Sequence, residues 1–214
     1  MQNYQRIIHD FAAIPQTKRD AVKVGIVGEI FVKYSPLANN GLEKFLVSEG
    51  AEVVVPGLTD FLLYCVWNNV LDTRLYGKKR ALYPWVRLAF SFLNRRREEI
   101  SQLLRADGCF AAWTPFPEVI RMAEGYISEG VKMGEGWLLT AEMLELAHSG
   151  CRNIVCAQPF GCLPNHICGK GMMKPIKERN PDVNIVTIDY DPGASRVNQE
   201  NRLRLMLANA REKA

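Results

Sequence analysis

The stretch Val22–Val55, VKVGIVGEIFVKYSPLANNGLEKFLVSEGAEVVV, decides the fold class. It begins with a short β-branched run, Val22–Val27, and ends with a second such run, Glu52–Val55. Between the two runs, Asn40 can cap a helix over residues 41–48. A strand, a helix and a strand in so short a stretch predict a parallel βαβ crossover.

The last third of the chain repeats this alternation. A helix is expected over Trp137–His148, and strands are expected over Asn153–Ala157 and Asn184–Asp189. Ser195 can then cap a closing helix. The sequence therefore predicts an α/β fold with an open, mainly parallel sheet and flanking helices.

A helical segment separates these two parts. Helices are expected over Leu58–Trp67, over Val86–Arg105 and from Pro115 to about Ile127. Leu58–Trp67 is apolar on too many sides to face water, so we expect it to pack inside the protein. The whole chain, 1–214, is expected to form a single α/β domain or two closely packed lobes.

The composition excludes several classes of protein. Of 214 residues, 48% are hydrophobic and 23% are charged, which argues against disorder. The longest apolar stretch, Phe61–Trp67, is too short to span a bilayer, and the first residues lack the pattern of a signal peptide. We therefore expect a cytoplasmic protein without a membrane partner.

The positive charge is concentrated in the middle of the chain. The segment Arg74–Arg105 holds nine basic and two acidic residues, whereas the whole chain has a net charge of +4. Such a segment can be a solvated helix face, or it can attract phosphates or an acidic protein. No nucleic-acid-binding motif accompanies it, so no nucleic-acid partner is expected.

Six cysteines are too few, in a chain of this length, for a disulfide scaffold. Cys156 alternates with Ile154 in an expected strand, which favours a place in the core. We expect Cys65 and Cys109 to be small core hydrophobes as well. Four of the six fall close together; the full set is Cys65, Cys109, Cys151, Cys156, Cys162 and Cys168.

Cys162 stands apart because it follows Gly161 in a loop after an expected strand. A thiolate on such a loop is accessible, which favours a metal-ligand or redox role. Cys168 is a weaker candidate, and so is Cys156. A zinc set of Cys151, Cys156, Cys162 and His166 is an alternative, although the two close ligand pairs of most zinc sites are absent.

Loops at the carboxyl ends of parallel strands meet at one edge of a sheet. Three loops should gather there, over residues 28–40, 158–171 and 190–195. They carry two candidates for proton transfer, Glu29 and His166, although capping or solvated roles fit these residues equally. Neither a phosphate-binding P-loop nor a dinucleotide fingerprint is present.

Three segments of the chain resemble the 2-hydroxyacyl-CoA dehydratase superfamily. They are VKVGIVGEIFVKYSPLANNGLEKFL (22–46), PFGCLPNHICGKG (159–171) and IDYDPGASRVNQENRLRLML (188–207). The sequence looks closest to the dehydratase-related C-terminal part of CoA-substrate-specific enzyme activase proteins. The resemblance covers most of the chain, from about residue 22 onward, and it implies a Rossmann-like domain.

The resemblance also implies a cofactor. Cys162, with Gly161 and Pro164 beside it, matches the cysteine that this part of the family gives to a 4Fe-4S cluster. The remaining ligands belong to an upstream domain or subunit, so the chain resembles the C-terminal part of a larger cluster-binding protein. From loop placement alone, Gly28, Glu29, Asn39 and Asn40 are expected to face the same cavity.

In such a system an ATPase activator supplies low-potential electrons, and an acyl-CoA is the substrate of a lyase-type reaction. The Arg74–Arg105 segment is then a candidate for contacts with CoA phosphates or with the activator. Two alternatives remain open, because the chain lacks the other family ligands. One is an interaction or regulatory domain without a cluster or catalysis, and the other is a structural zinc domain.

Overall fold

The computed structural model describes residues 2–16 and 20–212. By their internal contacts the residues form two units. Unit 1 is Met1–Asp20 with Leu58–Glu118, and unit 2 is Ala21–Gly57 with Val119–Ala214. The chain therefore leaves unit 2 after its second strand and returns to it after the helical middle.

Unit 2 is built on a four-stranded sheet in the order β2-β1-β3-β4. All pairs of neighbouring strands are parallel. The predicted α/β class with an open, parallel sheet is confirmed. Each expected strand lies within two residues of an observed one; the strands are β1 (Val22–Gly28), β2 (Ala51–Val54), β3 (Asn153–Pro159) and β4 (Asn184–Tyr190).

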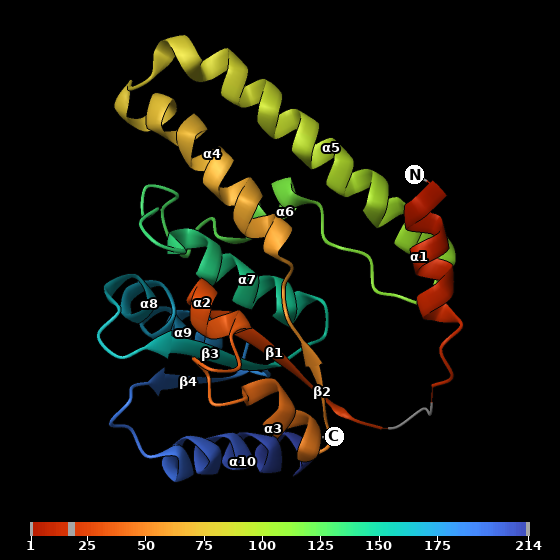
Figure 1. Cartoon of the computed structure of the whole chain (residues 1–214). Helices are drawn as coiled ribbons and strands as arrows, with labels where there is room; N and C mark the ends of the chain where they lie inside the picture. The colour runs from red at the N-terminus through yellow and green to blue at the C-terminus, as the bar shows by residue number, and fades with distance from the viewer. Residues whose placement is uncertain (1, 17–19, 213–214) are drawn as a thin grey trace. The chain divides into compact units, whose positions relative to one another are not determined.

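Helices cover both faces of this sheet (Figure 1). On one face, α3 (Leu42–Ser48) and α10 (Arg196–Glu212) pack against Ile26 and Val155. On the other face, the helices pack against strand residues that alternate with these, such as Val27 and Ile154; they are α7 (Gly136–His148), α8 (Leu163–Cys168) and α9 (Met173–Arg179).

Two expected loops contain short helices. The first loop holds α2 (Ile30–Tyr34), and the loop after β3 holds α8, which the 3-10 turn η2 (Lys170–Met172) follows. The prediction that Asn40 caps α3 is wrong. Asn39 Oδ1 accepts the Leu42 N–H at 3.1 Å, whereas Asn40 has a φ of 54° and donates to Gln199 at 3.0 Å.

In unit 1, α4 (Leu58–Tyr76) and α5 (Tyr83–Asp107) form an antiparallel hairpin. The 3-10 turn η1 (Arg80–Leu82) joins them, and α1 (Gln2–Ala12) packs against α5 (Figure 1). A buried ion pair crosses the hairpin, because the Arg97 guanidinium lies 2.6 Å from the Asp60 carboxylate. Arg97 also donates to the Thr114 carbonyl at 2.6 Å, which fixes the chain after α5.

Three predictions for the helical middle are wrong. Helix α4 is longer than expected and does not pack fully inside, since Leu58 and Leu62 are 51% and 54% exposed. Cys65 and Cys109 are exposed rather than buried, because Cys65 lines an open groove between α4 and α5 and Cys109 lies just after α5. The helix expected from Pro115 to Ile127 is short; it is α6 (Phe116–Met122).

Candidate functional site

The carboxyl ends of β1 and β3 mark the point where the strand order reverses. The chain runs from β1 outward to β2 and then crosses to β3 on the other side of β1. Ligands of open α/β sheets bind at such a reversal. The two strands approach closely here, since a Cβ added at Gly28 would lie 1.8 Å from the Ala157 carbonyl oxygen. Gly28, a predicted site residue, thus lies at this edge.

Cys162 lies at the same edge, at the residue that precedes α8. Its extended backbone starts the helix, and its carbonyl accepts the His166 N–H at 3.0 Å. Its side chain is half-buried, with the sulfur 3.3 Å from the Asn165 side-chain nitrogen. Gly161 has a φ of 74° and lets the loop turn into α8, and Pro164 occupies the first turn of that helix.

Glu135 fixes the Asn165 amide. Its Oε2 accepts Asn165 Nδ2–H at 3.0 Å, and its Oε1 accepts the Ile30 backbone N–H at 2.9 Å. An amide nitrogen carries two hydrogens, so Asn165 has one for Glu135 and one for the sulfur of Cys162. The reversed amide would set its oxygen against the carboxylate, so the charge on Glu135 decides the orientation.

This orientation has a cost. Asn165 is fully buried, and its Oδ1 has no hydrogen-bond partner among the described residues. An unpaired buried carbonyl oxygen loses about 1–3 kcal/mol of solvation. The Asn165 amide thus donates an N–H to the Cys162 sulfur while its own oxygen is left without a hydrogen bond. Sequence reasoning missed both Glu135 and Asn165.

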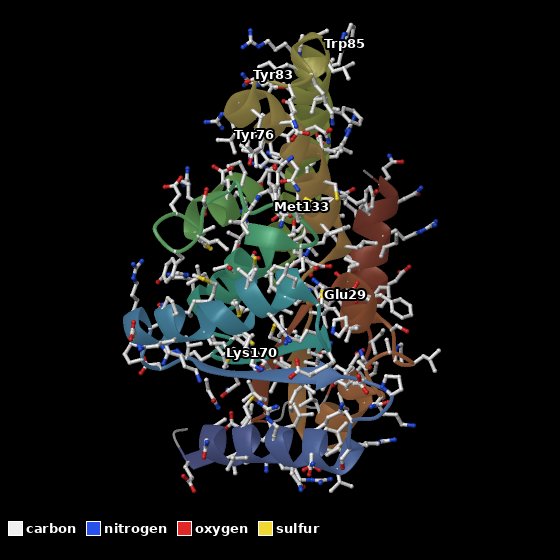
Figure 2. The ribbon with its side chains drawn as sticks, turned by 90° about the vertical axis from the view of Figure 1, so that its left-hand side faces the viewer. Glu29, Tyr76, Tyr83, Trp85, Met133 and Lys170 are labelled. Atoms are coloured by element: carbon white, nitrogen blue, oxygen red, sulfur yellow. The ribbon has the colours of Figure 1, made fainter. Side chains whose placement is uncertain are left out.

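A second hydrogen-bonded group lies at the ends of β3 and β4. The buried Gln158 donates from Nε2 to Asp189 Oδ1 and to His166 Nδ1, each at 2.6 Å. Because Nδ1 accepts, a neutral His166 carries its hydrogen on Nε2. Lys170 Nζ lies 3.8 Å from Asp189 Oδ2. Figure 2 faces this edge and shows Lys170 there.

Glu29, the other candidate for proton transfer, uses its side chain to cap α2. It is the residue before α2, and its Oε2 accepts the Val32 N–H at 2.8 Å. Its own N–H donates to the Ala157 carbonyl at 3.0 Å. Glu29 therefore caps a helix at this edge, where Figure 2 shows it.

A buried ion pair lies beside α2. Lys33 Nζ is 2.9 Å from Glu142 Oε1, and both side chains are almost fully buried. Burial disfavours the ammonium form of Lys33, but the charge of Glu142 and the nearby Tyr34 outweigh this effect, so the pKa of Lys33 lies above its ordinary value. Lys33 and Glu142 are 109 residues apart in the sequence, so no local sequence pattern predicts this ion pair.

The other cysteines of unit 2 lie in the core between the sheet and α7. Burial raises the pKa of the Cys151 thiol to about 11. Burial, with the nearby Glu142 charge, raises the pKa of Cys156 to about 12. Burial, with Glu135, raises the pKa of Cys168 to about 11. These thiols stay protonated at neutral pH.

The cysteines do not converge with other ligands. Within 2–16 and 20–212, no three His, Cys, Asp or Glu side chains are placed to hold a metal ion. The zinc set expected from Cys151, Cys156, Cys162 and His166 is therefore not assembled. Of the three cysteines expected as cluster ligands, Cys162 lies outside the core, whereas Cys156 and Cys168 are fully buried.

Asn39 and Asn40 serve the loop between α2 and α3. Asn39 is buried and donates from Nδ2 to the Val32 carbonyl at 2.8 Å, whereas Asn40 bonds to α10 through Gln199. No hydrogen bond links either side chain to Cys162 or Asn165 among the bonds described. Their contacts are those of residues that hold the loop in place.

Large exposed apolar side chains lie on the Cys162 loop and on the segment that meets Pro164. Phe160 and Leu163 flank its loop and are 70% and 69% exposed. Met133 is 76% exposed (Figure 2), and the adjacent Gly134 lies against Pro164. An exposed apolar rim around a polar site is typical of a surface that another protein covers.

The basic Arg74–Arg105 segment lies in unit 1, on α4, η1 and α5. Part of its charge is paired, because Arg95 and Arg96 both contact Glu99, at 3.2 and 2.7 Å. Nowhere in the described ranges is there a helix of the length and apolarity needed to cross a membrane. Comparisons with protein-family models, with curated proteins and with solved structures find no match.

Proposed function

We propose that this chain gives Cys162 as one ligand to an iron–sulfur cluster whose other ligands come from another domain or subunit. The observation that carries the proposal is the state of the Cys162 sulfur. Cys162 is half-buried at the strand-order reversal, and Asn165 Nδ2 donates to its sulfur at 3.3 Å. Hydrogen bonds of this kind tune the sulfur ligands of clusters.

The donor set supports a cluster that is shared with another domain or subunit. Cys156 and Cys168 are sealed in the core, and no group of three ligands exists in the described part of the chain. Cluster binding in proteins takes about four thiolates. Cys162 therefore supplies a single ligand, and the apolar rim of Phe160, Leu163 and Met133 receives the partner.

Each residue at this edge then has a distinct task. A bound cluster would supply single-electron transfer at low potential. Cys162 holds it, Asn165 donates to the sulfur, and Glu135 keeps that amide in place. The apolar rim, once covered, excludes water. His166, whose Nδ1 accepts from Gln158, carries its hydrogen on Nε2 and is the candidate proton donor, whereas Glu29 caps α2.

The resemblance to the 2-hydroxyacyl-CoA dehydratase superfamily supplies the wider context of this proposal. It suggests a reductive system with an ATPase activator as electron donor and an acyl-CoA as substrate. Cys162 lies within PFGCLPNH (159–166), one of the segments that carry the resemblance. The basic surface of unit 1 is then available for the activator or for CoA phosphates.

The proposal is tested by anaerobic reconstitution with iron and sulfide, alongside the chain that carries the remaining cysteines. The wild-type pair should develop cluster absorbance that the Cys162→Ala variant loses. The Cys109→Ala variant is the matched control, since Cys109 is an exposed cysteine in unit 1. Equal iron content in all three samples would contradict the proposal.

An interaction or regulatory domain without a cluster is the second candidate. The absence of a three-ligand group from the described residues favours it. The same apolar rim would then bind a partner without metal chemistry. Three results together would establish this candidate instead. The wild-type complex would contain no iron, Leu163→Ser would abolish partner binding, and Cys162→Ala would leave partner binding unchanged.

A further inference from the structure

His166 carries a hydrogen-bond donor that the described part of the chain does not use. Its Nδ1 accepts from Gln158 Nε2 at 2.6 Å, so a neutral imidazole carries its hydrogen on Nε2. Nε2 has no hydrogen-bond partner among the described residues, and the residue is half-buried. The His166 backbone N–H bonds to the Cys162 carbonyl at 3.0 Å, so this donor lies one helical turn from the proposed cluster ligand.

Asp189 determines where the hydrogen of His166 lies. Gln158 Nε2 has two hydrogens and donates them to His166 Nδ1 and to Asp189 Oδ1, each at 2.6 Å. If the amide reversed, its oxygen would face the Asp189 carboxylate, which repels it. In the observed orientation Gln158 Oε1 accepts from the Cys156 thiol at 3.9 Å, and Gln158 is fully buried. The charge on Asp189 therefore selects the Nε2–H tautomer through Gln158.

A histidine in this tautomer is suited to one kind of contact. A neutral imidazole that gave up its Nε2 proton would become an anion, which is unfavourable at neutral pH. An imidazole that bound a metal through Nε2 would carry its hydrogen on Nδ1, where that hydrogen would meet those of Gln158. The remaining use of Nε2–H is a hydrogen bond to an acceptor oxygen.

We propose that Gln158 and Asp189 are positioning residues that hold His166 as an Nε2–H donor to the carbonyl oxygen of a substrate thioester. The proposal rests on the proposed function, in which an acyl-CoA is the substrate, and it refines His166 from a proton donor to a hydrogen-bond donor. A neutral donor of this kind stabilises negative charge that develops on a carbonyl oxygen, without losing its own proton.

The tautomer is read by nitrogen-15 NMR on the 214-residue chain near pH 8, where histidine is ordinarily neutral. In the wild type, Nδ1 of His166 should give the resonance of a nitrogen without a hydrogen. In Asp189→Asn, the two ring nitrogens should exchange these resonances. Lys170 Nζ, 3.8 Å from Asp189 Oδ2, favours the oxygen of the new amide on its own side, so the amide nitrogen turns towards Gln158. Gln158 then reverses, and its oxygen accepts a hydrogen from Nδ1.

Matched variants separate this effect from a general disturbance. Asp182→Asn is the control, since Asp182 is exposed, pairs with Arg152 at 3.3 Å and precedes β4 at the opposite edge of the sheet. It should leave the tautomer unchanged. Lys170→Met combined with Asp189→Asn, and separately Gln158→Met, should each give a mixture of both tautomers. Circular dichroism establishes that each variant is folded. A single Nε2–H tautomer retained in both Asp189→Asn and Gln158→Met would overturn the positioning role.

Acetyl-CoA tests the substrate oxygen, with CoA as the control that lacks the carbonyl. Acetyl-CoA should shift the Nε2 resonance of His166, CoA should not, and Gln158→Met should weaken the response. Equal shifts with both compounds would overturn the assignment of the oxygen. So would the lack of a shift with acetyl-CoA, both in the chain alone and in its complex with the cysteine-bearing partner. The tautomer is measured without iron, so a failed cluster reconstitution and a failed positioning role give different results.

Discussion

The six cysteines differ in burial, and this difference changes the reactivity of otherwise identical side chains. Cys162 is held at an edge of the sheet by a hydrogen-bond donor, whereas Cys156 and Cys168 are packed among aliphatic side chains. Burial keeps the core thiols protonated, so they lack the thiolate that reacts with electrophiles and metals. Sequence position alone distinguished Cys162 correctly as a loop residue, but it placed Cys109 in the core.

This contrast predicts the pattern of alkylation in the native chain. With iodoacetamide near pH 8, Cys162 should be modified, while Cys151, Cys156 and Cys168 should react only after unfolding. Peptide mass spectrometry with and without denaturant measures this. Modification of Cys156 in the folded chain at the rate of Cys162 would contradict the burial described here.

The raised pKa of Cys156 also links stability to pH. A thiol with a pKa of about 12 in the folded state, against an ordinary value of 9.0, stays protonated while the unfolded chain ionises. Its stabilising contribution is complete below pH 9 and is lost as pH rises towards 12. Between pH 8 and pH 10, Cys156 should account for a loss of about 1 kcal/mol in the free energy of unfolding.

Urea denaturation at the two pH values measures that loss. The Cys156→Ala variant is less stable at both, but the decrease between pH 8 and pH 10 should be smaller by about 1 kcal/mol. An unchanged decrease would show that other groups produce it.

Lys33 and Glu142 provide a second residue-level prediction. Lys33→Met leaves a carboxylate buried without its partner, so the free energy of unfolding should fall by about 3–5 kcal/mol. Lys23→Met is the control, because Lys23 and Glu52 form a half-exposed pair at 3.6 Å whose loss costs at most about 1 kcal/mol. The double variant Lys33→Met/Glu142→Leu should recover most of the loss.

At the scale of the element, Gly28 decides how β1 meets β3. It has a φ of 141°, and an added Cβ would collide with the backbone of Ala157. Gly28→Ala should therefore lower the free energy of unfolding by more than about 3 kcal/mol. Gly41→Ala has a positive φ but open space around it, so about 1–2 kcal/mol is expected. Thermal unfolding of both variants compares them.

The strands were the most predictable elements, and the short helices were the least. Runs such as Val22–Val27 are rich in β-branched residues, which favour strands. Each strand predicted from such a run lies within two residues of the observed one, as β1 shows. Helices α2 and α8 are only five and six residues long, so neither shows a helical period. The first turn of α2 depends on Glu29, whose side chain accepts the Val32 N–H, and this contact becomes visible only in three dimensions. The first turn of α8 holds Pro164 and has no side-chain cap.

At the scale of the whole molecule, the sheet edge could be predicted, but its contacts could not. The α/β pattern places the loops after β1 and β3 together by a general rule of parallel sheets. Glu135 comes from outside those loops and meets Ile30, 105 residues away, and Asn165. Such long-range pairs depend on how the helices pack, and a single sequence does not encode them in a local pattern.

The two interleaved units carry different features of the chain. Unit 2 holds the Cys162 edge, while unit 1 holds the basic Arg74–Arg105 segment. The net charge lies in unit 1, since unit 2 has as many acidic as basic residues.

The most direct test of the central claim is the iron and sulfide content of the complex that this chain forms with its cysteine-bearing partner. The complex is purified without oxygen as wild type, Cys162→Ala and Cys109→Ala. We predict that iron and sulfide are present in the wild type and in Cys109→Ala, and that both are lost in Cys162→Ala while the partner remains bound. Iron and sulfide retained in full without Cys162 would contradict the account.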